Sequence, residues 1–331
     1  MVGQIDSRYI QMRPTKFFSR MVSYAFFEGR PVTTRGQWIN PLVLGIHSFA
    51  KRFPVTKKIE QPIFIMGTGR SGTTILGVVL SMHRDCGFLN EPKALWYSVF
   101  PFEDIIGSYT RGDAFYELDA RHADADSIKD IRKTFGFYLS AVMSKRLVDK
   151  YPELIFRIEF LREIFPDFKG LFIYRNGWDT CISSANWSDV KGQTKNDELH
   201  DWWGVDNRKW NILIDQVVSK DDELSTNIGV IREMSNPVDK SVVEWIVSMK
   251  RGFAMAEKYP KNILPVRYES LVAQPENTLN EICSFCNLTK DAVMIKYGLN
   301  TLQAVPSKEP VEIHEVLKPV FQKWMAKLNY R

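Results

Sequence analysis

The sequence predicts an α/β fold in which a parallel sheet is flanked by helices and preceded by a helical N-terminal leader. Residues 61–67 (QPIFIMG) form a short apolar run that leads through a glycine-rich turn into an apolar helix, Thr73 to Met82. A second buried strand is expected at 169–175 (KGLFIYR), before a helix that begins near Trp178. A helix from Pro237 to Tyr259 precedes a third strand, 262–268 (NILPVRY). Strands that alternate with helices in this way are typical of a parallel sheet.

Composition excludes several other classes. The chain has 331 residues, of which 44% are hydrophobic and 25% charged, so it is neither disordered nor collagen-like. No stretch approaches the 18 uninterrupted apolar residues of a membrane-spanning helix, and the first residues lack the apolar core of a signal peptide. We therefore expect a cytoplasmic protein.

The positive charge is concentrated in a leader, residues 1–60, which has ten basic and three acidic side chains. The leader carries +7 and the other 271 residues carry −2, so no nucleic-acid partner is expected. Residues 16–30 have apolar side chains at helical spacing: Phe17, Phe18, Met21, Val22, Ala25 and Phe26. This stripe fits a helix that lies peripherally on a membrane, but such stripes more commonly pack on a protein core.

The rest of the chain is assigned to one domain, 61–331, because no linker or repeat divides it. Within it, helices are expected from Ile128 to Val148, from Glu159 to Phe165 and from Pro275 onward. Residues 188–236 are polar and poorly periodic and read as an insertion, which would act as a lid or an acceptor-binding region. This region and its edge are rich in tryptophan, at Trp187, Trp202, Trp203 and Trp210.

The cysteines and histidines do not suggest a metal site. Cys283 and Cys286 form a CxxC without a second pair, in a segment that reads as an amphipathic helix, so all four cysteines are expected to be reduced. The five histidines are scattered without ligand spacing, and no metal is expected. His83, just past the helix that follows the glycine turn, is kept as a substitute general base.

The most informative segment is 67–74, GTGRSGTT. It has the glycine spacing of a Walker A loop, whose backbone N–H groups enclose phosphate oxygens, but Thr73 stands where the lysine should be. Without that lysine, nucleoside triphosphate hydrolysis is disfavoured. The loop therefore predicts a site for a smaller anionic group, in which charged or hydroxyl side chains supplement the backbone: Gly69, Arg70, Ser71, Gly72, Thr73 and Thr74.

Four ordered motifs over roughly residues 60–330 resemble the sulfotransferase family that uses 3′-phosphoadenosine 5′-phosphosulfate (PAPS). They are RSGTT at 70–74, FLNEP at 88–92, DKYPE at 149–153 with the stretch that follows it to Ser184, and VRYESL at 266–271 with its following proline and helix. The likeness is strongest to the branch that contains Golgi carbohydrate and tyrosylprotein sulfotransferases and bacterial relatives. It implies a P-loop NTPase-like sulfotransferase fold, PAPS as donor and adenosine 3′,5′-bisphosphate (PAP) as product.

The strand that ends at Arg175 is followed eight residues later by Ser183, so a guanidinium and a hydroxyl can converge on one phosphate. The resemblance implies that this is the 3′-phosphate of the nucleotide. The alternative is an ion pair between Arg175 and Asp179. Residues 176–178 are Asn-Gly-Trp, where the family more often has Asp-Pro-Arg, so contacts with the adenosine can differ.

Glu91 lies in an apolar segment (GFLNEPKALW), where partial burial would raise its pKa and suit it to take a proton from a hydroxyl. A capping or salt-bridging role is the alternative. The resemblance makes Glu91 the catalytic base and places Lys150 beside the bridging oxygen of the phosphosulfate, where it would act with Arg70. It also implies that Tyr268 contacts adenine and that Lys308 closes over the nucleotide.

The predicted activity is in-line transfer of a sulfuryl group to a hydroxyl, rather than an amine, of a glycan, glycolipid or small metabolite. Residues 93–109 and the tryptophan-rich insertion would recognise the acceptor. Two alternatives remain: a small-molecule kinase with a degenerate Walker A loop, and a non-catalytic nucleotide-binding protein associated with a membrane.

Overall fold

A computed structural model describes residues 2–54 and 56–330 of the chain. Its centre is a five-stranded parallel sheet in the order β2-β3-β1-β4-β8. The strands are β1 (Ile63–Gly67), β2 (Cys86–Asn90), β3 (Arg146–Lys150), β4 (Lys169–Tyr174) and β8 (Ile263–Arg267). From β1 the chain runs to one edge of the sheet, and from β4 it runs to the other. Ligands of open α/β sheets bind at the carboxyl ends of strands where the direction reverses in this way.

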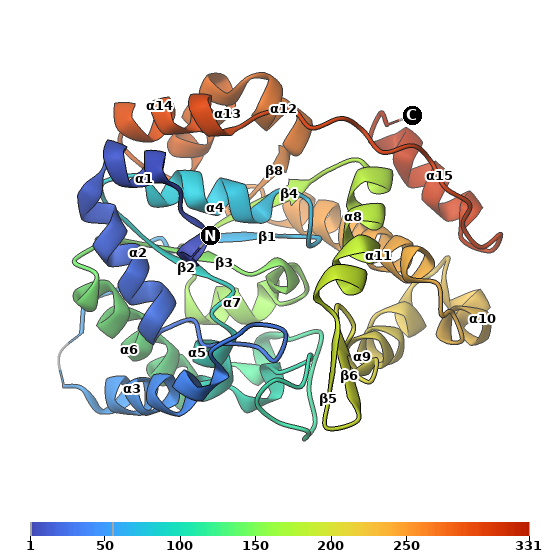
Figure 1. The fold of residues 1–331 in the computed structure, drawn as a ribbon, viewed down its shortest axis with the longest axis horizontal. Helices are drawn as coiled ribbons and strands as arrows, with labels where there is room; N and C mark the ends of the chain where they lie inside the picture. Colours follow the sequence, from blue (N-terminus) through green and yellow to red (C-terminus); the bar gives the residue numbers. More distant parts are fainter. Residues whose placement is uncertain (1, 55, 331) are drawn as a thin grey trace.

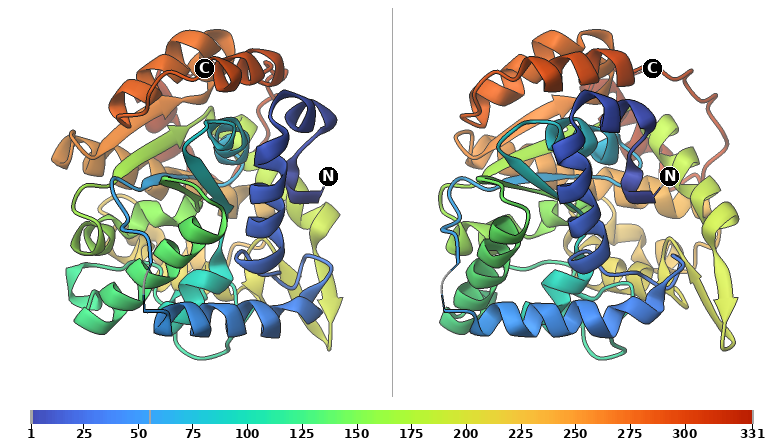
Figure 2. Two further views of the ribbon diagram at one scale, coloured as in Figure 1. Left: turned by 90° about the vertical axis from the view of Figure 1, so that its left-hand side faces the viewer. Right: turned by 60° about the vertical axis from the view of Figure 1, so that its left-hand side comes forward.

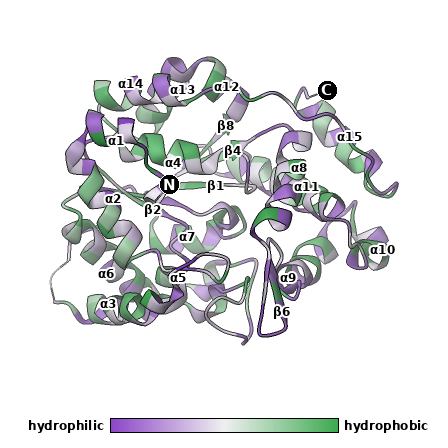
Figure 3. Cartoon of the chain, in the orientation of Figure 1, coloured by the Kyte–Doolittle hydropathy of each residue, from purple (hydrophilic) through white to green (hydrophobic). Residues whose placement is uncertain are grey.

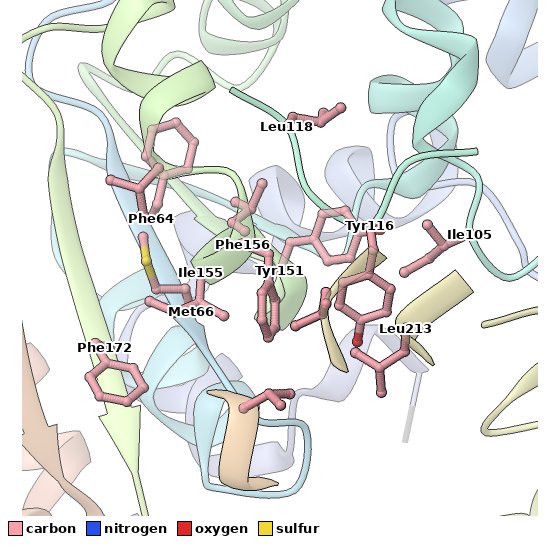
Figure 4. Packing of buried hydrophobic residues seen from close by; sticks show 14 of the residues in the cluster. Phe64, Met66, Ile105, Tyr116, Leu118, Tyr151, Ile155, Phe156, Phe172 and Leu213 are labelled. Atoms are coloured by element: carbon pink, nitrogen blue, oxygen red, sulfur yellow. The ribbon is translucent and has the colours of Figure 1, made fainter. Parts of the chain in front are cut away.

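The sheet is buried on both faces, because successive side chains of a strand point to opposite sides. In β1, Phe64 and Met66 belong to one apolar core, while Ile63 and Ile65 belong to the other. Figure 4 shows Phe64 and Met66 among the large apolar side chains of the first core. The apolar colouring of β1 and α4 in Figure 3 follows from this double burial.

Helices cover both faces (Figure 1). The face that contains Ile63 and Ile65 is covered by α1 (Ser7–Met12), α4 (Thr73–Ser81), α12 (Tyr268–Ala273), α13 (Pro275–Phe285) and α14 (Ala292–Thr301). The other core is enclosed by α5 (Lys93–Val99), α6 (Ala125–Ala141), α7 (Ile158–Ile164), α8 (Gly177–Lys191), α11 (Pro237–Lys258) and α15 (Lys318–Lys327). No helix in the described residues is long and apolar enough to cross a membrane.

The predicted α/β class and three of the strands are confirmed, but the helix expected from Ile128 to Val148 is wrong at its end. The helix stops at Ala141, Met143 takes a φ of +50°, and the chain enters β3 at Arg146. Strands β2 and β3 were not predicted. Polar residues conceal β3 in the sequence, because Asp149 is buried as the acceptor of the Trp96 indole N–H at 2.8 Å.

The leader packs on the body through α1, α2 (Pro14–Phe26) and α3 (Asn40–Arg52), as both views of Figure 2 show. The alternative of docking on the protein is therefore correct, and Phe17, Met21 and Val22 of the predicted stripe pack against the two cores. The residues of α2 that are buried are Lys16, Arg20 and Ser23, whereas Phe18 is 71% exposed. Lys16 Nζ donates to the carbonyl of Cys86 at 2.6 Å, and burial lowers the pKa of this ammonium group.

The expected irregular insertion, 188–236, is mostly regular structure. It holds the end of α8, a small antiparallel sheet of β5 (Gln193–Lys195), β6 (Glu198–Asp201) and β7 (Gly204–Val205), and then α9 (Arg208–Gln216) and α10 (Ile228–Arg232). Trp203 and Trp210 are buried in the core and contact each other edge to face. The hydrophobic pattern of this region shows no clear helix or strand period, because its strands are only two to four residues long and some of its tryptophans are buried in the core. The cysteine prediction is confirmed, since all four thiols are free and buried.

Candidate active site

The glycine-rich loop joins β1 to α4 and depends on residues without a side chain. Gly67 has a φ of +144°, and a Cβ there would collide with the carbonyl of Ile173 in β4. Gly72 caps α4 with a φ of +98°, and no side chain accepts from the first turn. The N–H groups of that turn therefore remain available to an anion, and the helix dipole favours negative charge there.

Some side chains of the loop are buried in the protein, and others are accessible to a ligand. The hydroxyl of Ser71 lies 2.6 Å from the carbonyl of Thr68 and 3.3 Å from that of Ile173, and as a donor to them it braces the loop. Thr73 is buried, while Thr74 is partly accessible. Arg70 extends outward and donates from Nε to Ser183 Oγ at 3.1 Å. The loop and the helix after β4 thus meet at Arg70 and Ser183.

Arg175 is held at the end of β4 by two contacts. Its Nη2 lies 3.0 Å from Asp179 Oδ2, and its guanidinium lies 4.5 Å from the centre of the Tyr268 ring. The ion pair that was the alternative reading of Arg175 is therefore present. Arg175 Nε is nevertheless buried without a partner among the described residues. Arg175 Nε can therefore donate to an acceptor that the described residues do not supply.

Tyr268 and Lys308 also reach this end of the site. The ring of Tyr268 packs so closely on Gly72 that a Cβ at Gly72 would collide with it. The backbone N–H of Lys308 donates to Asp179 Oδ1 at 2.6 Å, while its side chain is exposed. Asp179 therefore ties Arg175 to the 302–313 segment. The sequence pattern predicted Asp179 only as a competing partner for Arg175, four residues away.

Glu91 directly follows β2, and Lys150 is the last residue of the adjacent strand β3, in register with Asn90. Lys150 Nζ forms an ion pair with Glu91 Oε1, and Lys93 Nζ lies 3.7 Å from Glu91 Oε2. The Lys150 side chain is 1% exposed and that of Glu91 is 38% exposed, so the carboxylate is the member that solvent or substrate reaches. Glu91 has a φ of +49°, a strained conformation of the kind that clusters at functional sites.

The expected upward shift of the Glu91 pKa is wrong. Burial acts to raise the pKa, but the charges of Lys150 and Lys93 outweigh it, and the pKa of Glu91 is lowered. The salt-bridging alternative is thus realised. Glu91 is consequently a carboxylate at neutral pH, which is the protonation state that a general base requires.

His83 is not part of the site. It lies beyond the C-terminal end of α4, whereas the loop lies at the N-terminal end. Its Nε2 contacts the carbonyl of Thr289 at 2.8 Å, its Nδ1 accepts the N–H of Asp85 at 3.1 Å, and burial lowers its pKa. The prediction of His83 as a substitute base is therefore wrong, and the residue joins α4 to the segment before α14.

Trp202 is a residue of the site whose position the sequence did not predict. Its ring lies against Gly69, where a Cβ would collide with it, so the insertion covers the glycine loop. Its Nε1 donates to Glu244 Oε2 at 2.9 Å. Lys209 lies 2.6 Å from Glu244 Oε1 and 4.9 Å from the centre of the Trp202 ring. In the sequence, the glycine at position 69 is the one local feature that is consistent with a bulky side chain packed against the loop.

A cavity of about 230 Å³ opens beside Glu91 and Gly69. Residues from the two predicted acceptor-binding segments line it: Lys93, Ile106 and Ser108 from the first, and His200, Asp201, Trp202, Gly204 and Lys209 from the insertion. Trp187 of α8 and several leader residues complete its wall. The structure therefore joins a glycine-rich loop with an uncapped helix N-terminus, a carboxylate paired with a lysine, and a cavity of small-molecule size.

The chain was compared with known proteins. A model described as the sulfotransferase family matches residues 62–226 and 213–292. Sulfotransferase STF9 from Mycobacterium avium is 14% identical, with a TM-score of 0.52 over 99% of this chain and 93% of that one. A sulfotransferase domain from the curacin biosynthetic pathway is 14% identical, with a TM-score of 0.48 over 83% of this chain and 99% of that one. No curated protein sequence matches the chain.

Proposed function

The chain belongs to the sulfotransferase family, and we propose that it transfers a sulfuryl group from PAPS to a hydroxyl of a small acceptor. The proposal depends on the position of Glu91, an ionised carboxylate that lines the cavity together with Gly69 of the glycine-rich loop. An acceptor in that cavity would lie between the base and the reacting group.

The residues around the loop fit a donor with two phosphate-like groups. Two features support this fit: the first turn of α4 has no side-chain cap, and Arg175 Nε is buried without a partner in the described part of the chain. We assign the 5′-phosphosulfate to the loop and Arg70, and the 3′-phosphate to Arg175 and Ser183. Tyr268 would contact the adenine and Lys308 would close the nucleotide end. PAPS would supply an activated sulfuryl group with PAP as its leaving group.

The chain's own residues would then act on the proton and on the charge. Glu91 would accept the hydroxyl proton as the acceptor oxygen bonds to sulfur and the bond between sulfur and the bridging oxygen breaks. The negative charge that develops on the bridging oxygen would be stabilised by Lys150, with Arg70 and the loop N–H groups around it. Trp202 would exclude water from the loop, because it covers Gly69.

Two measurements test this function. Calorimetry should show that PAP binds more tightly than ATP. The Glu91→Gln variant should keep its PAP affinity and lose about 10²- to 10⁴-fold of its transfer rate, as expected for removal of a general base. Failure of PAP to bind contradicts the donor assignment, and preference for ATP with Mg²⁺ points to the kinase. Full transfer by Glu91→Gln removes Glu91 as the base.

We also propose a cytosolic enzyme whose leader touches an anionic membrane, and one observation favours this. Trp38, Leu42 and Phe49 are each more than half exposed and lie at helical spacing along α3 and the turn before it. Arg35 and Arg52 are exposed at the two ends of this stripe. Apolar side chains bordered by cations fit an anionic lipid surface. Free, buried cysteines favour a reducing compartment.

Vesicle sedimentation tests the membrane contact. The protein should sediment with phosphatidylcholine vesicles that contain phosphatidylglycerol, and substitution of Trp38→Ser with Phe49→Ser should abolish this. Phe18→Ser is the matched control, because Phe18 is an exposed aromatic residue of α2 and does not belong to the set Trp38, Leu42 and Phe49. Equal loss in the control, or concentration-dependent dimerisation through the stripe without vesicle binding, contradicts the proposal.

A further inference from the structure

The cavity beside Glu91 has one wall that lies outside the region matched by the family model. That model begins at residue 62, yet Tyr24, Glu28 and Arg30 of the leader line the cavity. The leader therefore brings its own side chains to the place where an acceptor would bind.

A buried ion pair between Arg20 and Glu28 connects this wall to the carboxyl end of strand β2, next to Glu91. Arg20 contacts Glu28 at 2.5 and 2.9 Å, and both side chains are almost completely buried. Glu28 Oε1 also accepts the backbone N–H of Asn90 at 2.7 Å. Asn90 directly precedes Glu91, whose backbone is held at a positive φ. A charge-assisted bond to the preceding N–H fixes the point from which Glu91 projects.

The leader turn after Glu28 is rigidly built. Gly29 has a φ of +72°, and a Cβ there would collide with Ala94 of α5. The N–H of Arg30 donates to Asn40 Oδ1, and Asn40 Nδ2 donates to the carbonyl of Arg30, both at 2.8 Å. Close packing on one side and paired bonds on the other hold the turn in place, so its cavity-facing side chains are positioned before any ligand arrives.

The chemistry of the cavity restricts what it can take. Asn90 Oδ1 is buried and lacks a hydrogen-bond partner in the described residues, so it can accept from a ligand hydroxyl. The aromatic side chains Tyr24, Trp187 and Trp202 suit the apolar face of a ring. The charged residues of the wall are nearly balanced, with four carboxylates and three cations: Glu28, Glu91, Glu153 and Asp201, and Arg30, Lys93 and Lys209. An acidic polymer would find no excess of positive charge there.

We propose that the leader is part of the acceptor site. Glu28, held by Arg20, is a positioning residue for Glu91, and the cavity takes one uncharged, hydroxylated ring of roughly monosaccharide size. This inference rests on the proposed sulfuryl transfer, and it adds the segment before residue 62 to the machinery of that reaction.

Glu28→Gln is the main test, because it keeps the shape of the side chain and removes its charge. Transfer from labelled PAPS to methyl glucoside and to phenol, and the slow transfer to water, should fall roughly 10- to 100-fold in kcat, as expected when a reacting group is displaced. The KM for PAPS and the affinity for PAP should not change. Glu28→Asp, which keeps the charge, should recover part of the rate.

Arg13→Gln is the matched control in the same leader. Arg13 makes two bonds of 2.7 Å to Asp291 and does not line the cavity, so its loss perturbs leader docking alone. We expect a lower melting temperature with an unchanged kcat. Equal kcat losses in both variants, in step with their melting temperatures, would show a merely structural role and overturn the proposal.

The remaining outcomes separate the inference from the function on which it rests. Absence of PAP binding by the wild-type chain refutes the proposed function itself. If PAP binds but the Glu28→Gln variant keeps the wild-type kcat, whether for the ring acceptors or for water, the positioning role of Glu28 is refuted. Faster transfer to glucuronic acid than to methyl glucoside, or no transfer to either uncharged ring, refutes the acceptor class.

Discussion

Glu91 and Lys150 are joined twice, once through the backbone and once through their side chains. The N–H of Glu91 donates to the carbonyl of Lys150 at 2.7 Å, and the ammonium of Lys150 forms an ion pair with the carboxylate. Breaking a buried pair by removal of one partner leaves an uncompensated charge. The pair therefore controls both the protonation of the proposed base and the cost of burying its lysine.

The first prediction concerns the pH dependence of transfer. The pKa of Glu91 lies below its ordinary value, so kcat/KM should be flat near neutral pH and fall only when acid protonates the carboxylate. Lys150→Met removes the largest charge that lowers this pKa, so the acid limb should move to higher pH. Lys93→Met should move it less, because Lys93 is the smaller influence. Acid limbs that coincide in all three proteins would exclude Glu91 as the titrating base.

The second prediction concerns the nucleotide's 3′-phosphate. Arg175→Met should weaken PAP binding roughly 10- to 100-fold, the worth of a charge-assisted hydrogen bond. The affinity for 5′-AMP, which has no 3′-phosphate, should stay the same. Calorimetry with both ligands checks this. A parallel loss for the two nucleotides would mean that Arg175 acts through the adenosine or through folding.

The third prediction concerns the cover over the loop. Gly69→Ala should lower transfer, because the added methyl would overlap the Trp202 ring. Adding Trp202→Ala should make the methyl harmless, so the double variant should equal Trp202→Ala alone. Gly45→Ala is the control, since nothing lies within 4 Å of its added Cβ and alanine favours a helix. Additive losses in the double variant would argue against contact between the two residues.

The fourth prediction concerns stability. Burial raises the pKa of Asp149 to about 8, although the Trp96 hydrogen bond opposes the shift. The folded chain then binds this proton more tightly than the unfolded chain, so Asp149 lowers stability as pH rises from its usual pKa of 3.8 toward 8. Asp149→Asn should melt at least about 2 °C above wild type at pH 8. The difference should shrink near pH 4, and a constant difference would contradict the prediction.

The local parts of the fold were predictable from the sequence. The apolar run, glycine turn and helix at 61–82 predicted β1, the loop and α4, because strand and helix periods and glycine conformations act between near neighbours. The end of the 128–148 helix was missed because β3 has only five residues, two of which, Asp149 and Lys150, are ionisable yet buried. Partners far along the chain satisfy those groups, and no local pattern reports them.

The candidate site divides in the same way. The sequence by itself determined the glycine-rich loop between β1 and α4 and the residue types at Glu91, Lys150 and Arg175. Only the tertiary structure decided the charge state of Glu91, because burial and two lysines compete there and their balance depends on distance. It also decided that Trp202 covers the loop and that the leader's Glu28 reaches Asn90. These contacts join segments distant in sequence, and they form because the folded core brings their elements together.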